Sequence, residues 1–273
     1  TLSPSSAASD VYKRQVSSEV GAGKAFGLHE LMDQVGAVVG PAIVSAVLFS
    51  TGEYSLAFLA LLFPYLLLVA ATLTTYAKLK SVSPAKGEKR SAKGRKLPLS
   101  FKLYCAAVML NTMGLVPIAL MLYEASYVLA AWLIPLAYLA AQLVDAVSAL
   151  FAGYAYDKVG RAVLLVPFAL SIVPSVLAVV GGLEHLVAAI LTFGVVYGMQ
   201  ESVYRAAVSD LTPVEVRGTS YGIFNSICGL GFLASGAVFG YFIDVGATSV
   251  AIAYAIAMEV AALSLLLKSL PKS

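Results

Sequence analysis

Charged residues are scarce in this chain of 273 residues. Asp, Glu, Lys and Arg make up 12% of the sequence and hydrophobic residues 60%, whereas a soluble domain carries about 25% charged residues. This deficit excludes a water-soluble enzyme. Cysteine is scarce too: Cys105 and Cys228 lie far apart in apolar runs, which excludes a disulfide framework or a cysteine-based zinc site. The net charge of +3 is too small to indicate a nucleic-acid partner.

Apolar runs are what the chain has in abundance. A run of about 20 residues crosses a bilayer as a helix, and eight such runs are present. They span 26–50, 54–77, 101–123, 128–151, 162–181, 185–207, 219–243 and 247–270. The runs lack the two-residue alternation of barrel strands, and backbone groups must be paired within hydrocarbon. We therefore expect an all-α transmembrane protein with eight helices.

The connectors between the runs alternate in charge. Those after the first, third, fifth and seventh runs contain Glu53, Glu124, Glu184 and Asp244 but no lysine or arginine. Because basic connectors stay in the cytoplasm, we expect a multi-pass protein of the plasma (inner) membrane with both ends of the chain cytoplasmic. The longest connector, 78–100, is basic and contains Pro, Ser and Gly, which is typical of a flexible linker.

Residues 1–15 are expected not to be native. The segment Ser5–Gln15, SSAASDVYKRQ, matches the reading-frame translation of a transposase-type sequencing adapter. Segments of this kind are left out of fold reasoning. A disordered natural tail is the alternative interpretation.

Two segments that open helices resemble each other at a constant separation of 195 positions. Gly23, Phe26, Gly27, Leu28 and Gly36 correspond to Gly218, Tyr221, Gly222, Ile223 and Gly231. Since the first segment opens run one and the second opens run seven, the repeat unit is six helices in the same orientation. The chain is therefore expected to hold the last eight of twelve helices: two from an N-terminal bundle (16–77), the linker, and a complete six-helix C-terminal bundle (101–273).

Three motifs resemble those of the major facilitator superfamily of secondary transporters. Gly27, Gly36, Gly40 and Pro41 are similar to the glycine-rich fifth-helix motif of antiporters, without its closing glycines. Gly153, Asp157, Lys158, Gly160 and Arg161 are similar to the family's loop motif, with Ala162 in place of its final base. The stretch 198–222, which contains Glu201, Arg205 and Arg217, resembles the junction of helices ten and eleven. The resemblance covers 16–270 and implies the fold of that superfamily, in which two bundles rock about a central site.

The spacing of the glycine and loop motifs indicates a physical role for each. Gly36 and Gly40 lie one turn apart, a spacing that lets a partner backbone approach closely, and Pro41 disrupts hydrogen bonding one turn back. This packing serves either a seal between the bundles or plain stability. Asp157 is expected near the start of the fifth helix, facing helix N-terminal amides, as a latch or a simple anchor. Arg217 is assigned to the same cytoplasmic gate.

Polar and ionisable groups at membrane depth are functional candidates, because placing them there is costly. The candidates for proton coupling and translocation are His29, Asp33, Asn111, Tyr138, Gln142, Asp145, Glu201 and Arg205. Asp33 and Asp145 have no base adjacent in the sequence and are the candidate proton carriers. His29 titrates with Asp33 or serves as a hydrogen-bonded gate. Glu201 and Arg205 have the spacing of an internal ion pair, and Glu259 stands alone in the last run.

The functional prediction is a secondary transporter and not an enzyme. The segment from His29 to Asp33 differs from the HExxH zinc helix at its second histidine, and we expect no metal or cofactor. Proton-coupled efflux (antiport) of a small organic compound by alternating access is the leading hypothesis. The partners would be the lipid bilayer, protons and a small-molecule substrate, with the full-length protein monomeric. A proton-coupled symporter for metabolite uptake and a non-transporting scaffold or sensor are the alternatives.

Overall fold

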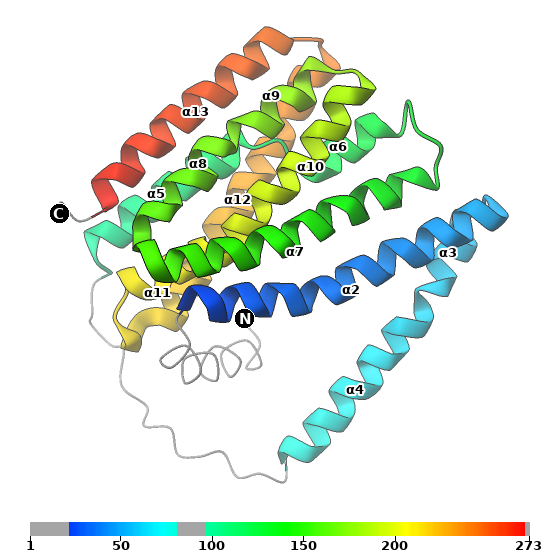
Figure 1. The fold of residues 1–273 in the computed structure, drawn as a ribbon, viewed down its shortest axis with the longest axis horizontal. Helices are drawn as coiled ribbons and strands as arrows, with labels where there is room; N and C mark the ends of the chain where they lie inside the picture. The colour runs from blue at the N-terminus through cyan, green and yellow to red at the C-terminus, as the bar shows by residue number, and fades with distance from the viewer. Residues whose placement is uncertain (1–21, 81–96, 271–273) are drawn as a thin grey trace.

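A computed structural model describes residues 22–80 and 97–270, and every regular element within them is a helix (Figure 1). The N-terminal part consists of α2 (Ala22–Thr51), α3 (Tyr54–Ala60) and α4 (Leu62–Lys80). The expected adapter segment and most of the predicted linker lie outside the described residues. The all-α prediction is confirmed.

The rest of the described chain forms a bundle, which we call the C-terminal bundle. Its first elements are α5 (Leu99–Gly114), α6 (Ile118–Ala125), α7 (Leu133–Val159), the 3-10 turn η1 (Gly160–Leu164), α8 (Leu165–Leu170) and α9 (Ile172–Val180). They are followed by α10 (Leu183–Met199), the π-turn η2 (Gln200–Tyr204), α11 (Arg205–Leu211), the 3-10 turn η3 (Val214–Val216), α12 (Arg217–Asp244) and α13 (Thr248–Ser269).

Six segments of the described chain are long and apolar enough to cross a bilayer, and α2 contributes a shorter apolar helix, Gly36–Thr51. One of the six, Leu133–Val180, has 48 residues, more than twice the roughly 20 that one pass needs. Gly160 lies inside it with a φ of +76°, a left-handed conformation that glycine adopts without strain. The ribbon reverses at this point between α7 and α8 (Figure 1). This segment therefore contains the predicted fourth and fifth passes, and the chain is a multi-pass membrane protein.

The third predicted pass is broken in the middle, which hydropathy does not show. Helix α5 ends at Gly114 and α6 begins after Pro117, which has no N–H to donate. The backbone groups freed at the break find side-chain partners: the Val116 N–H donates to Ser175 Oγ over 3.0 Å, and Ser235 Oγ donates to the Leu115 carbonyl. Such pairing is what permits a break at membrane depth.

Close helix approach occurs at different glycines from those predicted. A Cβ at Gly36 or Gly40 would have no neighbour within 4 Å among the described atoms, so a close approach at these two positions stays a prediction. A Cβ at Gly194 or Gly198 would instead overlap the backbone of α7. These two glycines, one turn apart on α10, let α10 and α7 pack backbone to backbone.

The N-terminal helices meet the C-terminal bundle through α2. This helix lies along α7 over much of its length, whereas α4 diverges from the bundle (Figure 1). Most side chains of α4 are consequently not covered by the described protein. Pro41 sits inside α2 without ending it.

Candidate functional site

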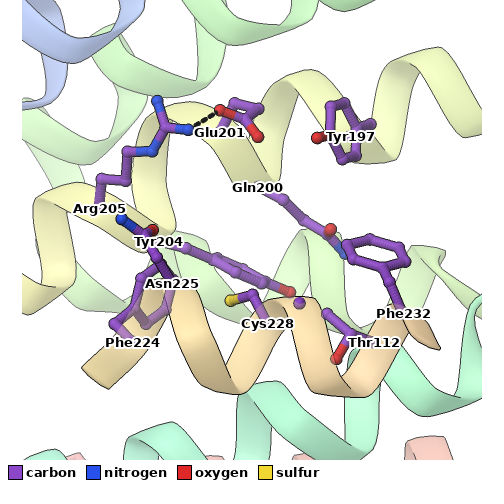
Figure 2. A pocket seen from close by; sticks show the side chains of 11 residues that line it. Thr112, Tyr197, Gln200, Glu201, Tyr204, Arg205, Phe224, Asn225, Cys228 and Phe232 are labelled. Atoms are coloured by element: carbon purple, nitrogen blue, oxygen red, sulfur yellow. Dashed lines mark ion pairs between the residues drawn. The ribbon is translucent and has the colours of Figure 1, made fainter. Parts of the chain in front are cut away.

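A cavity of about 230 Å³ opens between α5, the junction of α10 with η2, and α12, and we call it the polar pocket (Figure 2). The π-turn η2 forms one wall. π-turns insert an extra residue into a helix and are frequent at functional sites. Glu201 and Arg205 from this wall form an ion pair, as their spacing predicts. Phe224, Cys228 and Phe232 from α12 form the opposite wall (Figure 2).

A second cavity, also of about 230 Å³, adjoins the first, and we call it the apolar pocket. Tyr138 and Gln142 of α7 line it together with Phe193 of α10. Tyr197 and Phe232 belong to both pockets, with their ring centroids 6.2 Å apart. The two cavities thus share an aromatic wall, with a charged pair on one side and mainly apolar groups on the other.

A hydrogen-bonded seam joins α2 to α7. Gln34 Nε2 donates to Asp145 Oδ2 over 2.8 Å, and Gln142 Nε2 donates to Gln34 Oε1 over 2.9 Å. Asp145 is completely buried and Gln34 nearly so. The structure thus brings together Gln142 and Asp145, which the sequence places on one face of a helix, and adds Gln34, which sequence reasoning missed.

The other candidates on α2 are placed differently. The side chain of Asp33 is exposed, whereas its neighbour Gln34 faces α7. Asp33 therefore lies outside the seam. Gly27 and His29 belong to α2, but the burial of Gly27 and the side chain of His29 lie outside the described part of the structure. The pairing of His29 with Asp33 stays a prediction.

A buried polar cluster occupies the core of the C-terminal bundle. Asn111 Nδ2 donates to Glu259 Oε2 over 2.8 Å, and Ser171 Oγ lies 2.6 Å from the same oxygen. Asn111 Oδ1 accepts from Gln200 Nε2 over 3.0 Å and from Tyr204 OH over 2.8 Å. Glu259 is the only acidic residue of its own helix, and helices far apart in the sequence bring polar partners to it. Sequence reasoning found Asn111 but missed Ser171, Gln200 and Tyr204.

The loop motif is not a loop for most of its length. Helix α7 continues to Val159, so Gly153, Asp157 and Lys158 are helical and only Gly160 and Arg161 follow the helix. The expectation that Asp157 lies near the start of the fifth helix is wrong, because it lies in the last turn of α7.

The contacts at this end of α7 reach the end of α11. Tyr156 OH donates to Asp210 Oδ2 over 2.8 Å, and Arg161 Nη2 donates to the Asp210 carbonyl over 2.9 Å. Lys158 Nζ lies 4.3 Å from the centre of the Tyr154 ring. Arg217 Nε donates to the Thr212 carbonyl over 3.2 Å and holds the turn that precedes α12. Asp210 thus joins the two helix ends.

Among the residues that the structure describes, no group of three or more His, Cys, Asp or Glu is placed to hold a metal ion.

Comparison with known proteins gives a family match over nearly the whole sequence. The model described as Major Facilitator Superfamily matches residues 2–236 and 103–273. The chain is also 31% identical over 265 residues to uncharacterised proteins of Mycobacterium bovis and Mycobacterium tuberculosis. These alignments cover 94% of this chain and 64% of each relative. The chain therefore spans a little under two thirds of the length of these curated relatives.

Proposed function

This chain belongs to the major facilitator superfamily, whose members are secondary transporters and not enzymes, and from this premise we propose that the complete protein exports a small organic compound in exchange for protons. The two bundles would alternate between openings on either side of the membrane. The N-terminal bundle would contribute α2, α3 and α4. Since the chain spans 64% of the length of its relatives, the complete gene product is the protein in which transport is to be tested.

The observation that carries this proposal is the seam between α2 and α7. A buried carboxyl, Asp145, is held there by a glutamine from the neighbouring helix and is not sealed inside one rigid bundle. A group at a sliding interface changes its surroundings when the bundles move, and a change of surroundings is what drives proton uptake and release. Asp145 is therefore proposed as the proton carrier.

The paired pockets support an amphipathic organic compound as the substrate. Pockets for small molecules are about 300–1,000 Å³ and mostly apolar, with a few polar groups that orient the ligand. The polar and apolar pockets, about 230 Å³ each, fall within this range when taken together. The apolar body of the compound would rest against Phe193 and Tyr138, and its polar group would face Glu201 and Arg205.

The proposed orientation of the protein in the membrane follows from the placement of basic residues. Lys158 and Arg161 lie at the Gly160 end of the bundle, whereas Glu184 lies at the opposite end of the next pass. By the positive-inside rule the Gly160 end faces the cytoplasm. The protein is accordingly proposed to lie in the plasma membrane with both ends of this chain cytoplasmic.

Proton flux in vesicles tests the proposal. The complete protein is reconstituted into liposomes that enclose a pH-sensitive dye, and a panel of organic cations, anions and zwitterions is applied under an imposed proton gradient. Antiport predicts that at least one compound releases protons from the lumen as it enters. Protons and compound moving in the same direction would instead indicate uptake by symport. If no compound in the panel moves protons, the transport proposal fails and a scaffold or sensor becomes the better hypothesis.

A further inference from the structure

Glu259 is a carboxyl buried in the middle of a helix that the proposed transport mechanism does not use. It is the twelfth of the 22 residues of α13 and only 4% exposed. Its Oε2 accepts hydrogen bonds from Asn111 and Ser171. Its Oε1 has no hydrogen-bond partner within the described residues. Burying a carboxyl in this way destabilises the folded protein, so the residue is a functional candidate.

No cation offsets the charge of an ionised Glu259 in the described structure. The elements packed against α13 are α5, α8, α9 and α12. Helices α8 and α9 carry no titratable residue, and the titratable groups in the interiors of α5, α12 and α13 are tyrosines and cysteines, which are neutral near pH 7. Their charged residues, Lys102, Arg217, Asp244 and Lys268, lie toward the helix ends. Tyr204 donates a hydrogen bond to Asn111, which in turn donates one to Glu259, and as a tyrosine it too is neutral near pH 7. An uncompensated buried charge carries a desolvation cost that a bound proton removes.

Ser171 can accept a hydrogen bond from a proton bound to Glu259. Its Oγ lies 2.6 Å from Glu259 Oε2 and 2.7 Å from the carbonyl oxygen of Phe168. A hydroxyl has one hydrogen and therefore donates to one of these oxygens at a time. With Glu259 ionised, the hydroxyl points at Oε2. With a proton on Oε2, the hydroxyl turns to Phe168, and Ser171 Oγ accepts from the carboxylic acid.

Asn111 connects Glu259 to the polar pocket. Its amide nitrogen donates to Glu259, and its amide oxygen accepts from Gln200 and Tyr204 of the π-turn η2. Both of these residues line the polar pocket. A hydrogen bond to an ionised carboxylate is about twice as strong as one to a neutral group. Ionised Glu259 therefore fixes Asn111, and through it η2, more firmly than protonated Glu259 does.

We propose that Glu259 is a proton-binding residue in the core of the C-terminal bundle, with Ser171 accepting the proton's hydrogen bond and Asn111 transmitting the change to the wall of the polar pocket. The step is acid–base only: an O–H bond forms at Oε2 when a proton arrives from water and breaks when it leaves. The place of this step in transport rests on the proposed function, whereas proton binding by Glu259 does not.

Infrared spectroscopy of the complete protein in lipid tests the proton site. The wild type should show a carboxylic-acid C=O band at acidic pH that disappears as the pH rises. Glu259→Gln should lose this component, and Ser171→Ala should keep it at a shifted frequency. Glu184→Gln, on an exposed carboxylate in the first turn of α10, is the matched control and should leave the component unchanged. An identical carboxylic-acid band in wild type and Glu259→Gln would overturn the proposal. If Glu259→Gln does not fold, an unshifted band in Ser171→Ala would do the same.

Hydrogen–deuterium exchange tests the link to the pocket. At alkaline pH the amides of 200–204 should exchange at least ten-fold faster in Glu259→Gln than in the wild type, and at acidic pH the two should agree. Equal exchange at both pH values would overturn the role of Asn111 as a link. Neither measurement requires a substrate. A protein that fails the vesicle assay but passes these two tests would refute the transport proposal and retain the proton site.

Discussion

At the scale of single residues, Asp145 is the carboxyl whose position best fits the role of proton carrier, because it is buried between α2 and α7. Replacing it by Asn keeps an oxygen for Gln34 to bond but removes the capacity to bind a proton. We expect Asp145→Asn in the complete protein to lower proton-coupled flux at least ten-fold. Exchange of the compound across the membrane without a gradient should stay within about two-fold of wild type, because the substitution removes proton coupling and leaves binding of the compound intact. Parallel counterflow and proton-flux assays in liposomes would measure both quantities.

A matched control for this substitution is Asp244→Asn, because Asp244 is an exposed carboxylate at the end of α12. It should leave both fluxes unchanged. Loss of counterflow together with proton flux in Asp145→Asn would contradict the carrier role and would indicate that the seam is needed only to hold the bundles together.

The residues of the seam show what sequence spacing can and cannot predict. Gln142 and Asp145 are three residues apart, so the helical period alone places them on one face. Gln34 could not be chosen in the same way, because its charged neighbour Asp33 is the more conspicuous residue. Which of the two faces α7 depends on the rotation of α2 about its axis, and that rotation is decided by tertiary packing. Ser171 was missed for a similar reason, since a single serine in an apolar run is a weak signal.

At the scale of elements, the contact between α7 and α10 depends on two glycines. A Cβ at Gly198 would overlap the Asp145 carbonyl oxygen, so the two backbones would have to separate. We expect Gly198→Ala to lower the free energy of unfolding by about 1–3 kcal/mol, the usual penalty for overpacking. The melting temperature of the purified complete protein should fall by several degrees. Scanning calorimetry or circular dichroism in detergent would measure the change.

Gly40 provides the comparison, because a Cβ there has no neighbour within 4 Å among the described atoms. Gly40→Ala should therefore leave the melting temperature unchanged or raise it slightly, since alanine favours helix. The reverse order, with Gly40→Ala the more harmful of the two, would show that the glycine motif of α2 makes the close contact that the sequence predicts.

The elements themselves were largely predictable, and their interruptions were not. Apolar runs of about 20 residues identify membrane helices because hydrocarbon demands apolar side chains and paired backbone groups. The break between α5 and α6 depends on Ser175 and Ser235, which lie on other helices and compensate the freed backbone groups. The extension of α7 to Val159 was missed because glycine and charged residues near its end suggested a loop.

At the scale of the whole molecule, the sequence predicts more than the described residues can test. The repeat predicts two bundles of six helices, and the described chain contains one bundle together with α2, α3 and α4. Side chains of α4 such as Phe63, Tyr65 and Leu68 are exposed in the described structure. Lipid or further protein can cover such a surface, and an apolar run has the same composition in either case. Hydropathy therefore predicts that a helix crosses the membrane but not what it contacts there.

The orientation of the whole molecule in the membrane is predicted from the distribution of lysine and arginine and not from helix packing. Two single-cysteine proteins can test it. In the complete protein, Cys105 and Cys228 are first replaced by Ala together with any other native cysteine, and Glu184→Cys or Lys158→Cys is then introduced. Both positions are exposed, so each new thiol is accessible from its own side of the membrane. Because lysine and arginine are retained in the cytoplasm, a membrane-impermeant maleimide should label Glu184→Cys in intact cells and Lys158→Cys only after permeabilisation. The opposite pattern would invert the proposed topology.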